Sequence, residues 1–113
     1  MKLRIFENSI RLRLSQADAA RLSNEGFLEA ALWFNTHSAL RYRLLLGSAP
    51  AASFDGKTVV ISIPSADARE WLSSDREGMG VMAGPLKVSV EKDYECLHRE
   101  NGEDSFPNPL KKQ

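Results

Sequence analysis

Strict alternation of apolar and polar residues is the feature that most constrains this chain. In Ser9–Leu14, three aliphatic residues fall on one side of an extended backbone, and Arg11 and Arg13 fall on the other. A period of two is typical of a half-buried antiparallel strand, because successive side chains point to opposite faces. Leu40–Leu46 repeats the pattern with two further arginines. We therefore expect a sheet with one buried face and one arginine-bearing face.

Turn residues divide the rest of the chain into further strands. The Asp55-Gly56 pair predicts a type I′ hairpin turn, and Glu7-Asn8 predicts a two-residue turn because Asn tolerates positive φ. The glycine-containing stretch 78–85 is expected to be irregular. The expected strands are Leu3–Phe6, Ser9–Leu14, Phe27–Phe34, Leu40–Leu46, Ala52–Phe54, Lys57–Ile63 and Leu86–Val90.

Two short helices are expected between the strands. Ser15 can cap the first helix by accepting a hydrogen bond from the Asp18 amide, and Gly26 is a natural stop. The second helix is expected over Ser65–Ser74. Each helix follows a turn and a strand and ends at a Glu-Gly pair. This order indicates an internal duplication, although cap and stop residues also recur by chance.

These elements indicate an α+β fold with a mainly antiparallel sheet of seven or eight strands and two short helices. Such a sheet can curl into a half-barrel or barrel. Residues 1–98 are expected to form a single domain, and residues 99–113 a polar loop or tail.

Composition excludes several classes of protein. The 113 residues contain one cysteine, Cys96, so no internal disulfide forms. The sequence has no signal-like or membrane-spanning apolar run and no common nucleotide-binding or hydrolase motif. We therefore expect a cytoplasmic protein without a membrane anchor, and favour a binding protein over an enzyme. The net charge is zero, but residues 1–50 hold seven basic and four acidic residues, and residues 51–113 hold eight and eleven.

The arginines are the main candidate ligand-binding residues. On neighbouring strands their guanidinium groups would lie close together and could bind phosphate or carboxylate. The alternative is a solvated sheet face on which Glu29, Glu91 and Asp93 pair with them. The candidates are Arg4, Arg11, Arg13, Arg41 and Arg43.

Other residues have a chemical and a structural interpretation. Glu91 and Asp93 fall on one face of a strand end and could hold a divalent metal, or could pair with arginines. Cys96 could be a reactive thiol, but its acidic neighbours favour an inert one. Trp33 and Trp71 are expected to be core anchors, and His37 is expected in a surface turn.

Three resemblances bear on function. The segments Asn8–Ser15 (NSIRLRLS), Glu91–Leu97 (EKDYECL) and Phe106–Pro109 (FPNP) resemble a family of small bacterial proteins of unknown function, over nearly the whole chain. The repeated architecture is similar to the CYTH-like triphosphate-tunnel fold, which implies phosphate held by inward cations and metal held by carboxylates. Its Glu-x-Glu-x-Lys hallmark is replaced here by Lys2-Leu3-Arg4-Ile5.

The third resemblance, over residues 2–34, is to swapped-hairpin DNA-binding modules, although Glu7 and Ser15 replace their usual Gly and Pro. Three functions follow as hypotheses. The first is a non-enzymatic module that binds a nucleotide, polyphosphate or nucleic-acid backbone on the arginine face, without a cofactor. The second is a metal-dependent phosphohydrolase. The third is a homo-oligomeric structural or interaction protein, or a hairpin-type DNA-binding regulator.

Overall fold

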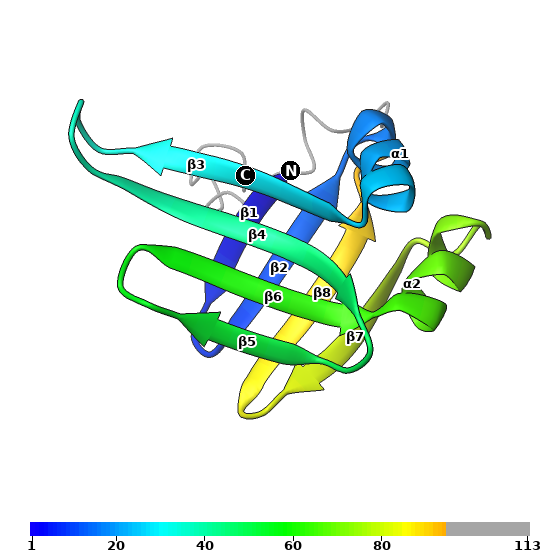
Figure 1. Cartoon of the computed structure of the whole chain (residues 1–113). Coiled ribbons are helices and arrows are strands. Elements are labelled where there is room, and N and C mark those ends of the chain that lie inside the picture. Colours follow the sequence, from blue (N-terminus) through cyan, green and yellow to red (C-terminus); the bar gives the residue numbers. More distant parts are fainter. Residues whose placement is uncertain (95–113) are drawn as a thin grey trace, which may run out of the picture.

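Two four-stranded sheets and two helices make up residues 1–94, the part of the chain that the computed structural model describes. The sheets lie one behind the other with their strands crossing, and both helices lie at one end (Figure 1). The predicted boundary at residue 98, the tail 99–113 and Cys96 lie outside the described residues. The elements are β1 (Lys2–Phe6), β2 (Ser9–Leu14), α1 (Gln16–Glu25), β3 (Phe27–Trp33), β4 (Ala39–Gly47), β5 (Ala51–Phe54), β6 (Thr58–Pro64), α2 (Ser65–Leu72), β7 (Gly78–Ala83) and β8 (Leu86–Lys92).

The α+β class is confirmed, but the expectation of a single, mainly antiparallel sheet of seven or eight strands that curls into a half-barrel or barrel is wrong. One sheet has the order β1-β2-β8-β7 and the other β3-β4-β6-β5. Four strand pairs are antiparallel, and the two central pairs, β2–β8 and β4–β6, are parallel. Each sheet therefore combines one hairpin from each half of the chain and ends in two edge strands instead of closing.

The glycine-containing stretch 78–85 is not irregular, because Gly78–Ala83 forms edge strand β7. Its glycines are compatible with pairing, since a strand needs no side chain to make backbone hydrogen bonds. A Cβ on Gly78 would lie 2.7 Å from the Val90 carbonyl oxygen, so only glycine allows this close approach to β8. The turn between β7 and β8 then falls at Gly84-Pro85.

Both predicted hairpin turns form, with different conformations from those expected. At the first, Glu7 and not Asn8 has the positive φ, 50°. Asn8 instead donates its side-chain N–H to the Pro85 carbonyl, 2.9 Å away. At the second, Gly56 has a φ of 94° while Asp55 keeps a negative φ, so the turn is not type I′.

Asp55 keeps that conformation because its side chain braces the turn. Its Oδ1 accepts hydrogen bonds from the amides of Lys57 and Thr58, each 2.8 Å long. These bonds hold the pKa of the Asp55 carboxyl below its ordinary value.

Both helices begin where the sequence predicts, but only α1 has a side-chain cap. The Asp18 amide donates to Ser15 Oγ and the Ser15 amide donates to Asp18 Oδ2, both at 3.1 Å, which is a capping box. Gly26 ends α1 in the left-handed conformation. The N-cap of α2 is Pro64, without a side-chain hydrogen bond, and Ser65 is its first helical residue.

The core lies between the two sheets and is closed by one large side chain from each helix, Leu22 from α1 and Trp71 from α2. Trp71 is a core anchor as expected, but Trp33 is 57% exposed on the far end of β3. The buried hydrophobic residues are Leu12, Leu14, Leu22, Leu28, Leu44, Ile61, Ile63, Ala68, Trp71, Met79, Ala83, Val88 and Val90.

The predicted order of elements occurs twice in three dimensions as well. Leu22 and Trp71 differ by 49 in number and occupy equivalent places in the two helices. The central parallel pairs also match. Leu12 pairs with Val90 in one sheet, and Ile61, which is equivalent to Leu12, pairs with Leu44 in the other. This equivalence aligns the two N-caps, Ser15 and Pro64.

Candidate functional site

The five candidate arginines lie on two separate surfaces. Strand β2, which carries Arg11 and Arg13, neighbours β1 and β8, whereas β4, which carries Arg41 and Arg43, neighbours β3 and β6. Because the core lies between the sheets, their outer faces point away from each other. Arg4 pairs with Arg11 across β1 and β2 and shares that face. The structure thus brings three of the arginines together and separates the other two from them.

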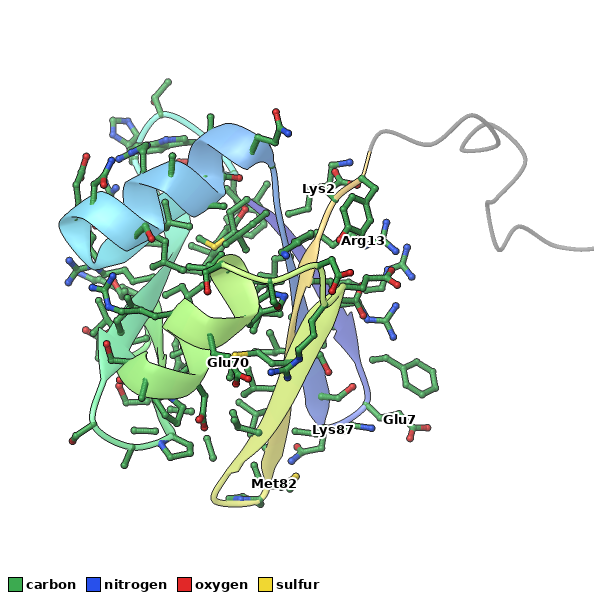
Figure 2. All side chains as sticks on the ribbon, turned by 90° about the vertical axis from the view of Figure 1, so that its right-hand side faces the viewer. Lys2, Glu7, Arg13, Glu70, Met82 and Lys87 are labelled. Carbon is green, nitrogen blue, oxygen red and sulfur yellow. The ribbon has the colours of Figure 1, made fainter. Side chains whose placement is uncertain are left out.

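We call the outer face of the β1-β2-β8-β7 sheet the basic face. By strand alternation it carries five cationic side chains and two carboxylates, Glu91 and Asp93. Figure 2 shows Arg13 projecting from this sheet on the side away from the second sheet. The five cations are Lys2, Arg4, Arg11, Arg13 and Lys87.

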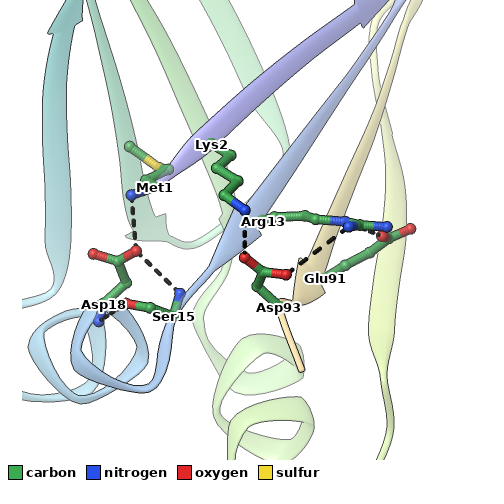
Figure 3. A network of polar contacts seen from close by, with 7 residues as sticks. All are labelled: Met1, Lys2, Arg13, Ser15, Asp18, Glu91 and Asp93. Carbon is green, nitrogen blue, oxygen red and sulfur yellow. Dashed lines mark hydrogen bonds and ion pairs between the residues drawn. The ribbon is translucent and has the colours of Figure 1, made fainter. Parts of the chain in front are cut away.

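The two carboxylates of the basic face are engaged by cations at one end of it. Glu91 lies 3.3 Å from Arg13 Nε and 3.4 Å from Arg11 Nε. Asp93 lies 2.9 Å from Lys2 Nζ (Figure 3). Glu91 and Asp93, the residues considered as metal ligands, therefore form ion pairs in this structure.

Asp18 adds a further contact beside this network (Figure 3). Its Oδ2 lies 2.8 Å from the Met1 ammonium nitrogen. Burial by itself raises the pKa of Asp18, but the hydrogen bonds from the Met1 ammonium and the Ser15 amide outweigh it, and the net pKa lies below the ordinary 3.8. This contact ties the start of β1 to the first turn of α1.

The other end of the basic face is hollowed. The hollow has a volume of about 350 Å³, and Lys87 has no carboxylate partner there among residues 1–94. Phe6 lines it and is 69% exposed. Cations from three adjacent strands therefore surround an accessible depression with an aromatic edge. Its lining residues are Arg4, Ile5, Phe6, Ser9, Ile10, Arg11, Lys87 and Ser89.

A second depression continues the first along the basic face. It has a volume of about 340 Å³ and shares Ser89 with the hollow. Gly78 and Gly80 form its floor beside Glu77 and Glu91. Small residues in the middle of the face thus leave a trough that is basic at one end and acidic at the other.

The outer face of the second sheet is filled by its own side chains. Glu29 Oε1 lies 3.1 Å from Arg43 Nε, and Glu29 Oε2 lies 3.7 Å from an Arg41 nitrogen. The Arg43 guanidinium lies 5.1 Å from the Phe27 ring centroid, and that of Arg41 lies 5.4 Å from the Trp33 ring centroid. The solvated-face interpretation therefore describes Arg41 and Arg43, including the predicted partner Glu29.

Comparison with known proteins identifies the family. The model of DUF7009, a family of unknown function, matches residues 1–110. The chain belongs to DUF7009. No curated protein and no solved structure matches it. The resemblance of the three quoted segments to a family of unknown function is thereby confirmed.

The CYTH-like resemblance is not supported for this DUF7009 chain, because its sheets form no closed tunnel and its arginines lie on outer faces. The β1–β2 hairpin pairs with β8 of the same chain. Among residues 1–94, no three His, Cys, Asp or Glu side chains gather as metal ligands. No helix of that region is long and apolar enough to cross a membrane.

Sequence reasoning missed Lys87, Ser89, Ser9 and Phe6. The alternation of Leu86–Val90 already placed Lys87 and Ser89 on the polar side of a strand. The missing information was the parallel pairing of β2 with β8, which sets Arg11 opposite Ser89. Residues 75 or more positions apart give no local signal for that pairing.

Proposed function

We propose that this DUF7009 protein is a non-enzymatic binding module that holds a small phosphorylated ligand of nucleotide size in the hollow of the basic face. The hollow carries the proposal, because Arg11 and Lys87 reach it from neighbouring strands and it is about 350 Å³ in volume. Guanidinium and ammonium groups are the usual protein partners of phosphate. The volume lies near the lower end of small-molecule sites.

The lining of the hollow supports a nucleotide over a bare anion. The hydroxyl groups of Ser9 and Ser89 can donate to phosphate oxygens, and the exposed ring of Phe6 offers a stacking surface for a base. A solvent-accessible site also suits modest affinity that depends on salt. We propose the cytoplasm as the location, because a chain with a single cysteine has no internal disulfide and suits a reducing compartment.

Titration calorimetry with inorganic tripolyphosphate and with each common ribonucleoside triphosphate tests this proposal. The site variant is Arg11→Gln with Lys87→Gln. The control is Arg41→Gln with Lys57→Gln, which removes the same charge from the second sheet. We expect the wild type and the control to bind a nucleoside triphosphate equally, and the site variant to bind it at least about tenfold more weakly.

Three results would contradict the proposal. One is a wild-type protein that binds none of these probes at low salt. Another is equal weakening in the site and control variants, which would indicate binding by general charge. The last is binding of a short single-stranded RNA without binding of any triphosphate, which would indicate a nucleic-acid surface.

A further inference from the structure

Strand β3 is an edge strand with only one of the features that usually protect such an edge, the charge of Glu29. It is seven residues long, Phe27–Trp33, and contains no Pro, Gly or Lys. The other edges differ: β1 carries Lys2 and Arg4, β5 has four residues, and β7 contains glycines. Long, largely apolar edges without Lys, Pro or a bulge pair readily with another strand. The β3 edge is therefore the one in residues 1–94 best suited to pairing.

The end of β3 also exposes large apolar side chains. Leu32 is 51% exposed, Trp33 57% and Phe34 67%. Figure 1 shows this end of the β3–β4 hairpin projecting away from the helices. Three adjacent large apolar residues at one exposed strand end are typical of an interaction surface.

The backbone groups available along β3 belong to its odd-numbered residues. The Phe34 amide donates to the Ser38 carbonyl and the Leu46 amide donates to the Gly26 carbonyl. Antiparallel pairs alternate, so the even-numbered residues of β3 bond to β4. Glu29, Ala31 and Trp33 therefore direct their N–H and C=O groups away from β4.

We propose that two copies of this chain pair through β3, antiparallel and centred on Ala31, and join their sheets into one eight-stranded sheet. With a two-fold axis at Ala31, the N–H and C=O groups of Ala31 bond to those of Ala31 in the second copy. The N–H and C=O groups of Glu29 bond to those of Trp33 in the second copy. This pairing uses Glu29–Trp33, the part of β3 that lies clear of α1 (Figure 1).

Charge favours the register centred on Ala31 over the register centred on Glu29. Centring on Glu29 would set two carboxylates directly opposite each other, which is unfavourable. Centring on Ala31 instead sets Glu29 beside Trp33 of the second copy, over which Arg41 is stacked at 5.4 Å. Glu29 of each copy then meets a cation of the other, and the small Ala31 leaves room for that approach.

Sedimentation of the full chain with the variant Ala31→Pro tests the pairing. Proline removes an N–H that points away from β4, so it should disrupt the dimer without breaking the ladder within the chain. We expect the wild type at twice the 12.6 kDa chain mass and the variant at the chain mass, with unchanged circular dichroism. The matched control is Ala52→Pro, at an outward N–H of edge strand β5, and it should remain dimeric.

Disulfide cross-linking between two copies tests the register centred on Ala31. Ala31→Cys in a Cys96→Ser background should cross-link on oxidation, because directly opposed residues of a hydrogen-bonded pair lie about 5.5 Å apart at Cα. Ala52→Cys in the same background should not. A monomeric wild type, a dimeric Ala31→Pro variant, or equal cross-linking of both cysteine variants would each overturn the proposal.

Discussion

The two halves of the chain, Lys2–Gly47 and Ala51–Lys92, share the same order of elements and the same strand pairing, and differ on their surfaces. In both halves a hairpin, a helix and a second hairpin follow in order. Leu12 pairs with Val90 as Ile61 pairs with Leu44, so even the register between halves is shared. The interior is therefore specified by the same apolar pattern twice.

The outer faces diverge at equivalent positions. Ser89 of β8 corresponds to Arg43 of β4, and Gly80 of β7 corresponds to Glu29 of β3. On the first sheet these small residues leave a trough between cations. On the second, Arg43 and Glu29 fill the space and pair with each other. The two sheets therefore have equivalent outer faces, and the size of the side chains determines that only the basic face is hollowed.

Trp71→Ala and Leu22→Ala are expected to have the largest effects and to test whether the halves share one core. Both side chains are fully buried, so each truncation should lower the free energy of unfolding by about 2–5 kcal/mol. Because every sheet contains strands of both halves, each variant should unfold in one transition. Urea unfolding followed by circular dichroism and by fluorescence measures this. Two separated transitions would show independent halves.

Ser89→Arg makes the basic face resemble the second sheet at one position. The substitution adds positive charge, but its long side chain fills the place where the hollow meets the second depression. We expect nucleoside triphosphate affinity to fall about tenfold, which is about 1.4 kcal/mol. Calorimetry under the conditions used for the wild type gives the value, with Ser62→Arg on the second sheet as control. Tighter binding by Ser89→Arg would mean that charge alone attracts the ligand.

Glu7→Gly and Gly56→Ala test the equivalent hairpin turns. Glu7 has a φ of 50° and Gly56 one of 94°, in the region that favours glycine. Glycine at position 7 should therefore stabilise the protein by about 1 kcal/mol, and alanine at position 56 should destabilise it by a similar amount. Thermal unfolding measures both. Shifts of the same sign would show that the turns are not equivalent.

Asp18→Asn tests the capping box that only α1 possesses, and has the smallest expected effect. Since the pKa of Asp18 is lowered in the folded protein, its charge stabilises the fold above the unfolded pKa, and this contribution is lost as the pH falls through the lower folded pKa. The variant should thus be less stable than wild type at pH 7, and the difference should shrink as the pH falls below the ordinary pKa of 3.8. Urea unfolding at several pH values measures this.

The control for that measurement is Asp67→Asn, at the equivalent place in α2. Pro64 has no backbone N–H, so no capping box can form there. This substitution should cost much less stability at neutral pH. An equal cost in both helices would contradict a role for the capping box.

Local patterns predicted most of the elements and part of the site. The Ser9–Leu14 strand, the Ser15 cap and the Gly26 stop follow from residues close in sequence, and the structure confirms each. Strand β7 was missed because glycine has no side-chain pattern to alternate. Arg4 and Arg11 were among the candidate residues and line the hollow, but Arg41 and Arg43 were grouped with them because sequence does not say which strands are neighbours.

The alternating strands, both helices and the repeated order of elements can be predicted from the residues alone, because they depend on side-chain periodicity and on caps within a few residues. The pairing of one hairpin from each half in every sheet, through the parallel pairs β2–β8 and β4–β6, appears only in the folded structure. That pairing depends on burying two apolar faces at once, which is a property of the whole core. It sets Lys87 and Ser89 beside Arg11, and so creates the hollow.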